Sequence, residues 1–382
     1  MHNGELTNAT FFGIIQVKLE TFPGTLSKAS RRAWHVPEEG KEVWTVTIKD
    51  IAKRCGVSVS TVSRALNNHP DVSDAVRERV METVRAVHYV PNNSARDLAK
   101  PQSNSIGLVV RGVGNPFFSK VMRSIENAIR QAGYMMTFCQ IPSGADEVSA
   151  GASLARSKKL KGLILLGGCC DYAPEQVAML KVPFVCCSYT NSFGGLREDA
   201  YSSVTINDRK EAYRAVELLI RQGHRKIALL LDSKEDCSIS QLRYEGYCKA
   251  LADHGIPLDL ELVEETEKFE MESAYAAMHR LLQRRDDFTA AFIIADAMAV
   301  AAIKALADAG KAVPRDCSVI AIDGITMSAY MIPTLTTLVQ PAEEMGERSV
   351  RILVDLIENK AGNCHVELDT SVRTGGSIRR LE

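Results

Sequence analysis

The stretch TIKDIAKRCGVSVSTVSRALN, residues 47–67, has the pattern of two short helices joined by a tight turn. Apolar residues recur at helical spacing at positions 48, 51, 52 and 55, and again at positions 59, 62 and 66. Thr47 and Asp50 form an acidic variant of an N-terminal capping box. Gly56 allows the turn, and Ser58 can cap the second helix. An ordinary surface hairpin would share this pattern, so the rest of the chain has to decide between the two interpretations.

The second helix leaves a polar face of small side chains and one guanidinium, formed by Ser60, Thr61, Ser63 and Arg64. A helix that enters a DNA major groove needs small side chains, because bulk would clash, and a forked donor can bind guanine. Val72 and Ser73 can staple and cap a third helix, which Pro91 ends. We therefore expect a three-helix DNA-binding headpiece over residues 46–91.

Charge and composition are compatible with a DNA-binding head on a larger body. The 382 residues suffice for two or three domains, and the formal net charge is −1. Residues 43–104 carry nine Lys/Arg and six Asp/Glu, a net charge of +3, and residues 1–42 carry five of each. The rest of the chain therefore has a net charge of about −4. The ten cysteines include no C-x-x-C, which favours small buried side chains over a metal or disulfide framework.

Strand and helix patterns alternate after residue 105. Short apolar runs at 106–110, 135–141, 162–166 and 184–187 form one series, and runs at 203–206, 226–231, 290–294 and 318–322 form a second. This alternation is typical of parallel sheets covered by helices on both faces. Two successive series predict two α/β lobes with a cleft where strand ends meet, and segments 334–341 and 365–370 return the chain between them.

The chain resembles the lac-repressor (LacI/GalR-type) family of bacterial transcription factors from about Val46 to its end. The resemblance is carried by GVSVSTVSRALN at 56–67, NPFF at 115–118, GHRKIA at 223–228, VPRDCSVIAID at 313–323 and PTLTTLVQP at 333–341. It implies a multidomain fold: an all-α helix-turn-helix headpiece and an α/β two-lobed, periplasmic-binding-protein-like effector and dimerisation domain at 105–382. Lobe 1 would span about 105–203 and 336–361, and lobe 2 about 204–335 and 362–382.

The resemblance also implies how DNA is bound. Each subunit of a dimer would present residues 59–64, including Val59, to half of a palindromic operator, with Arg64 reading a base. Residues 92–104 would form a hinge helix whose Ala95 and Leu98 face the minor groove, Leu98 acting as an apolar wedge; a plain linker is the alternative. Phosphate contacts that fix the register are expected from Thr47, Ser58, Ser63, Asn67, Ser73 and Asn92.

A small-molecule effector, expected to be a carbohydrate, would bind in the cleft. Phe117 or, preferably, Phe118 would stack on a flat ring, although both can be core residues. Arg243 matches the family arginine that reaches into the cleft. Asp296 and Asp323 end apolar strands, where a carboxylate either accepts from ligand hydroxyls or caps the next helix. Many relatives have Asp-Asn at 207–208 and Asn at 295, so the effector's identity stays open.

Other classes are less compatible with the sequence. Gly112-Val113-Gly114 imitates a dinucleotide fingerprint, but Phe117 occupies the third glycine position and no acidic residue ends the next strand. No catalytic set or metal spacing is present, so we expect neither an enzyme nor a cofactor nor a metal. A sugar transporter's solute-binding protein would need a secretion signal and no headpiece. We expect a cytoplasmic, nucleoid-associated homodimer without a coiled-coil tail; residues 1–45 predict a disordered extension or a misassigned start.

Overall fold

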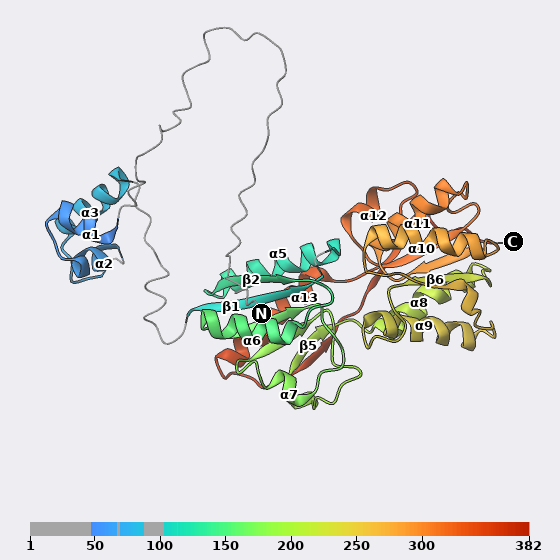
Figure 1. The fold of residues 1–382 in the computed structure, drawn as a ribbon, viewed down its shortest axis with the longest axis horizontal. Coiled ribbons are helices and arrows are strands. Elements are labelled where there is room, and N and C mark those ends of the chain that lie inside the picture. Colours follow the sequence, from blue (N-terminus) through green and yellow to red (C-terminus); the bar gives the residue numbers. More distant parts are fainter. Residues whose placement is uncertain (1–46, 67–68, 88–102, 113, 382) are drawn as a thin grey trace, which may run out of the picture. The chain divides into compact units, whose positions relative to one another are not determined.

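The computed structural model of the protein describes residues 47–66, 69–87, 103–112 and 114–381, whose fold is drawn in Figure 1. The chain separates into two compact units, Met1–Asn92 and Asn93–Glu382. The expectations for residues 1–45 and for the hinge at 92–102 fall outside the described residues. No helix in the described part of the chain is long and apolar enough to cross a membrane.

The first unit is a three-helix headpiece, with α1 (Ile48–Cys55), α2 (Val59–Leu66) and α3 (Asp74–Ala86). Gly56 adopts a left-handed φ of 64°, which ends α1 and turns the chain toward α2. The core is thin: Ile51, Val62 and Val80 are fully buried, one from each helix. Such a core supports a small domain whose outer faces stay available for binding.

The buried stripe of α2 differs from the prediction at its first position. The spacing of positions 59, 62 and 66 placed Val59 in the core, but Val59 is 40% exposed. The buried residues of α2 are Val62 and Ala65. Val59 is the first residue of its helix and stays partly in solvent, whereas Ala65, near the end of the helix, is 3% exposed.

The second unit contains two α/β lobes. The sheet of lobe 1 is all parallel, in the order β11-β5-β4-β3-β1-β2. Helices α5 and α13 pack together on one face, and α6 covers the other. The bounds are β1 Ser105–Arg111, α5 Pro116–Gln131, β2 Met135–Ile141, α6 Glu147–Lys158, β3 Gly162–Leu166, α7 Pro174–Val177, β4 Phe184–Cys187, β5 Ser202–Thr205, α13 Ala342–Ile357 and β11 His365–Glu367.

Lobe 2 repeats the plan with the strand order β12-β10-β9-β8-β6-β7, in which only β12 runs antiparallel to its neighbour. Helix α8 packs on α9, and α10 on α11. The bounds are α8 Asp208–Arg221, β6 Ile227–Leu231, α9 Ile239–Asp253, β7 Val263–Glu265, α10 Met271–Arg284, β8 Ala290–Ile293, α11 Asp296–Asp308, β9 Ser318–Asp323, α12 Thr326–Tyr330, β10 Thr336–Val339 and β12 Ser371–Arg373.

The boundaries between the lobes need correction. Strands β5 and β11 belong to the first sheet and β10 to the second, so the chain crosses at about 206–207, 340–341 and 368–370. The sequence had assigned 204–206 and 362–370 to lobe 2, and 336–341 to lobe 1. Apolar strands have similar sequences, and the sheet to which each belongs is determined only by the strand with which it pairs.

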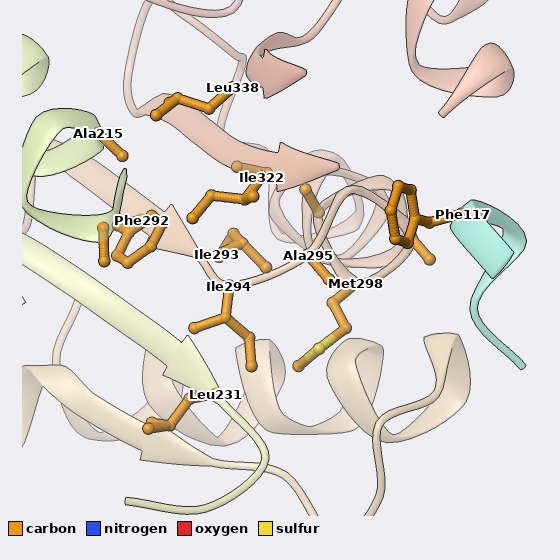
Figure 2. Close-up of a cluster of buried hydrophobic side chains, with 14 of the residues drawn as sticks. Phe117, Ala215, Leu231, Phe292, Ile293, Ile294, Ala295, Met298, Ile322 and Leu338 are labelled. Carbon is orange, nitrogen blue, oxygen red and sulfur yellow. The ribbon is translucent and has the colours of Figure 1, made fainter. Parts of the chain in front are cut away.

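Phe117 joins the cores of the two lobes. It lies at the start of α5 in lobe 1, is 2% exposed, and belongs to a hydrophobic cluster that continues through lobe 2. Figure 2 shows its ring on the side of the cluster where Ala295 and Met298 lie. A bulky ring buried in this shared cluster links α5 to the core of lobe 2, because burying an aromatic side chain contributes more than most other contacts.

Candidate nucleic-acid interface and effector cavity

Helix α2 presents short polar side chains outward. Ser58 accepts a hydrogen bond from the Thr61 backbone N–H (3.1 Å), which caps the helix, and its hydroxyl also pairs with those of Ser60 (2.7 Å) and Thr61 (2.8 Å). Ser58, Ser60 and Arg64 are exposed, and Thr61 and Ser63 are half-buried. The Arg64 side chain has no salt bridge to any described residue. Its five donors are therefore available for a ligand.

The remaining headpiece residues have more local roles. Thr47 precedes α1, and both its backbone N and its Oγ1 donate to Asp50 Oδ2, at 2.8 and 2.7 Å. These hydrogen bonds lower the pKa of Asp50. Ser73 precedes α3 but its side chain makes no capping hydrogen bond. Four further predicted DNA contacts, Asn67, Asn92, Ala95 and Leu98, lie outside the described residues.

A cavity of about 960 Å³ lies between the lobes of the second unit. Its walls come from the ends of strands in both lobes and from the loops that follow them, as expected for the carboxyl edge of parallel sheets. The polar lining includes Arg111, Gln140, Ser143, Asp232, Asp236, Ser240, Arg243, Glu267, Lys268, Glu270, Asp323 and Gln340. Phe117, Phe118 and Phe269 contribute rings. Four predicted effector residues thus meet in one cavity.

Arg243 is held rigidly at the wall of the cavity. It is 2% exposed, its guanidinium contacts Asp208 Oδ1 at 2.8 Å, and it donates to the carbonyl oxygen of Ile294. Asp208 begins α8 and is 4% exposed. Burial raises the pKa of Asp208, although the Arg243 charge opposes that shift. The pair fixes the guanidinium before any ligand arrives.

Asp323 is the second fixed group of the wall. It is 2% exposed and accepts hydrogen bonds from Asn115 Nδ2 (3.2 Å) and Gln340 Nε2 (2.8 Å). Burial raises its pKa to about 7, against the opposing effect of Arg243. Its backbone has a φ of 135°, which strains a residue with a side chain. Strain of this kind persists where neighbours hold a residue in place, as they do here.

Phe118 fits the role of a stacking ring better than Phe117. Phe118 is only partly buried and borders both the cavity and Gly167, where an added Cβ would come within 2.9 Å of its ring. Phe117 borders the cavity too, but its ring is almost entirely within the core. The two rings lie 6.0 Å apart at 49°.

Asp296 does not reach the cavity, contrary to its prediction as an effector contact. It is completely buried, and its carboxylate accepts from Ile325 N (2.9 Å), Ser328 Oγ (2.5 Å) and Thr337 Oγ1 (2.5 Å). These partners occupy the lone pairs that a ligand would need. Asp296 instead ties the start of α11 to the segments around β10 and α12. These contacts fit a structural role for Asp296 better than a role in binding the effector.

Several residues of the wall were not singled out from the sequence. Arg111 lies 3.6 Å from the buried carboxylate of Glu147, whose Oε1 accepts from Cys169 N at 2.7 Å. Asp232 accepts from Ser240 Oγ at 2.6 Å, and burial raises its pKa. Arg111 ends β1 and Asp232 follows β6, so strand-end position was a usable signal. Asp208 was marked in the sequence only as a departure from relatives.

Comparison with known proteins gives consistent matches over both units. The profile described as bacterial regulatory proteins, lacI family, matches residues 47–92, and a periplasmic binding protein-like domain matches 216–378. The HTH-type transcriptional regulator MalR of Clostridium butyricum is 40% identical over 329 residues, covering 86% of this chain and 97% of that protein. The HTH-type transcriptional repressor PurR of Pectobacterium carotovorum is 34% identical, covering 84% and 93%.

Solved structures give the same picture. A lac repressor dimer bound to operator and the anti-inducer ONPF is 26% identical, with a TM-score of 0.70 over 87% of this chain and 99% of that one. A complex of the transcriptional regulator CelR with cellobiose is 27% identical, with a TM-score of 0.64 and the same coverage. Both matches cover most of this chain and nearly all of the solved chain.

Proposed function

The chain belongs to the lacI family of HTH-type bacterial transcriptional regulators, and from that membership we propose how it reads DNA and responds to an effector. Helix α2 enters the major groove of an operator half-site, and Arg64 contacts a base edge. The observation that carries this proposal is the outward polar face of α2, on which an exposed Arg64 has no salt-bridge partner among the described residues. Thr47, Ser58, Ser63 and Ser73 contact phosphates and fix the register.

The effector is proposed to be an uncharged saccharide of more than one ring. The cavity lining has five carboxyl groups and three cationic side chains. Two of these cations, Arg111 and Arg243, already face the buried carboxylates of Glu147 and Asp208. An anionic ligand would therefore be repelled, whereas hydroxyl groups would find many acceptors. At about 960 Å³ the cavity is at the upper end of the usual range for small-molecule sites, and it exceeds the needs of one sugar ring.

Effector occupancy changes how the lobes meet. Hydrogen bonds that cross between them beside the cavity include Asn115 Nδ2 to Asp323 Oδ2, and Lys120 Nζ to the Gly324 carbonyl oxygen at 3.3 Å. A ligand hydroxyl that donates to Asp323 competes with Asn115 for the same oxygen. The equilibrium between lobe arrangements then shifts by the difference in ligand affinity, and the hinge segment transmits the shift to DNA binding.

The second unit is proposed to carry the dimer interface. Large apolar side chains at α12 and after it are exposed: Tyr330 by 83%, Ile332 by 96% and Met327 by 47%. The edge strand β2 exposes Met135 by 54% and Phe138 by 47%. Exposed apolar groups and open strand edges of this kind are normally covered by a partner. Sedimentation of a Tyr330→Ser, Ile332→Ser variant should show monomers where the parent forms dimers.

A mobility-shift titration on the palindrome nearest the chain's own gene tests the DNA proposal. The parent should bind that duplex in preference to a scrambled one, and saccharides should change the affinity. Maltose and cellobiose serve as neutral two-ring probes, with glucose and glucose 6-phosphate as the one-ring and anionic controls. Equal binding to both duplexes would refute operator recognition, and a response to glucose 6-phosphate alone would refute the neutral-effector proposal.

A solute-binding component of a transporter, the other candidate, is not favoured, since it has no use for a headpiece that matches a DNA-binding family over residues 47–92. The named homologues are transcriptional regulators rather than enzymes. We therefore infer a role in the cytoplasm, where DNA is accessible, with no catalytic step. Bound to its operator, the protein would be associated with the nucleoid.

A further inference from the structure

Lobe 1 has a basic edge on the side opposite the cavity, formed by Arg156, Lys158, Lys159, Lys161 and Lys181. All strands of this sheet are parallel, so the end of α6 with the loop before β3, and the loop before β4, lie at the same amino-terminal edge, and together they hold these residues. Residues 156–161 contain four cations and no carboxylate. The edge is thus positively charged within a unit that is negative as a whole, because residues 105–382 together have a net charge of about −4.

Few carboxylates neutralise this edge. No salt bridge within 4 Å joins Arg156, Lys158, Lys161 or Lys181 to a carboxylate among the described residues. Lys161 lies 5.4 Å from the centre of the Tyr134 ring. The carboxylate of Glu358, whose pKa Lys161 helps to lower, is already paired with Lys360. Arg156, Lys158 and Lys181 are exposed, so their charges are available to a partner.

Helix ends explain only part of the basic edge. Arg156 and Lys158 lie in the last turn of α6, where cations compensate the helix dipole. Lys161 and Lys181 follow helices at a distance and gain nothing from that effect. Lys159 and Lys181 also adopt left-handed backbone angles, with φ of 51° and 54°, where glycine or asparagine would fit with less strain.

The basic edge surrounds the point where the chain from the headpiece enters lobe 1. The backbone N and Oγ of Ser103 donate to the carbonyl oxygen of Lys159, at 3.1 and 3.0 Å. Lys161 N donates to Ser105 O at 2.9 Å. Only residues 88–102 separate this point from the end of the described headpiece. Any DNA that the headpiece holds is thereby tethered to the basic edge by a segment that spans at most about 55 Å when fully extended.

From this position and charge we propose that the basic edge is a second DNA-contacting surface, which binds the phosphate backbone that flanks the operator. The inference rests on the proposed function, because the headpiece has to bring the duplex within reach. The contact is independent of sequence and adds affinity through counterion release. Tethering raises the local concentration of phosphates, so that even a weak patch contributes. Another polyanion, such as an acidic protein, would not be held near the basic edge by the headpiece.

The test is a variant with Arg156→Gln, Lys158→Gln, Lys161→Gln and Lys181→Gln. A control has Arg225→Gln, Lys249→Gln, Lys304→Gln and Arg315→Gln, which remove the same number of cations, all exposed, from lobe 2. The affinity of each protein for the palindromic duplex is measured against salt, on a fragment of about 18 base pairs and on one of about 40, which extends beyond both half-sites. Thermal unfolding and effector binding verify that each variant is folded.

On the long fragment, each lost phosphate contact should reduce the slope of log affinity against log salt by about 0.9 and lower the affinity about eight-fold at 0.1 M salt. We expect the basic-edge variant to lose two or more such contacts on the long fragment and fewer on the short one. An unchanged slope on the long fragment overturns the proposal, as does an equal loss in the control. If the parent does not prefer the palindrome at all, the proposed function fails first.

Discussion

The headpiece and the two-lobed unit prepare for binding in opposite ways. In the headpiece most candidate contact residues are short polar side chains on or beside α2, exposed or half-buried, and the exposed Arg64 has no salt bridge to a described residue. In the second unit Arg243 and Asp323 are each 2% exposed and are held by partners from other elements before any ligand is present. The headpiece surface is therefore exposed before it binds DNA, whereas the groups that line the cavity are already fixed before an effector binds.

This difference follows from the sizes of the two ligands. A DNA groove desolvates a whole helix face at once, so the reading side chains can stay hydrated until contact. A small effector offers few groups, so the protein has to fix each of its own groups in advance to limit the loss of entropy on binding. Substitutions should therefore affect folding in the cavity and affect recognition in the headpiece.

The largest expected effect comes from Arg243→Met, which leaves Asp208 without its partner in the core of lobe 2. Removing one member of a buried ion pair costs about 3–5 kcal/mol, and chemical denaturation should show a loss of that size. Arg225→Met, at an exposed position, is the matched control and should change little. Adding Asp208→Leu should recover part of the loss. Full stability of Arg243→Met would mean that the pair does not organise the wall.

Arg64→Ala should leave unfolding unchanged and weaken operator binding by roughly 1–3 kcal/mol, with relaxed preference at a single base pair. Binding to a set of single-base operator variants measures this. Arg85→Ala, on the exposed side of α3, serves as the comparison and should keep the base preference. Equal weakening on every sequence would assign Arg64 to the phosphates instead.

A third prediction concerns pH. Because burial raises the pKa of Asp323 to about 7 from 3.8, the folded chain keeps a proton that the unfolded chain releases between these values. The contribution of Asp323 to stability therefore declines as the pH rises from about 4 to about 7 and is constant above that. Asp323→Asn, which cannot ionise, should gain stability relative to the parent by more than about 1 kcal/mol over this range. A difference that does not vary with pH would contradict the raised pKa.

The smallest effect is expected at Val59, which the helical spacing had assigned to the core. At 40% exposure, Val59→Ala should change the unfolding free energy by less than about 0.5 kcal/mol. Val62→Ala, at a fully buried position of the same helix, should cost more than about 1.5 kcal/mol. Equal losses in the two variants would restore Val59 to the core of the headpiece.

The family and fold class could be recognised from local patterns. Periodicity predicted the three headpiece helices, and runs of apolar residues predicted eight of the twelve strands in the two sheets. Strands β10 and β11 lie in segments that were expected only to return the chain between the lobes, and β7 and β12 were missed. The cavity was predicted less well. Arg243 and Asp323 were identified through a resemblance, and Asp296 was assigned to the same cavity although it faces a different neighbourhood. Two carboxylates at similar strand ends look equivalent in sequence.

Hydrophobic spacing, turn residues and composition were enough to specify a helical headpiece followed by parallel α/β lobes, because those signals act between residues a few positions apart. The sheet that received β5, β10 and β11, the pairing of Arg243 with Asp208 across 35 residues and the gathering of Arg156, Lys161 and Lys181 at one edge were decided by the folded chain. These features depend on contacts between segments far apart in sequence, and no local pattern encodes which distant segment will be the neighbour.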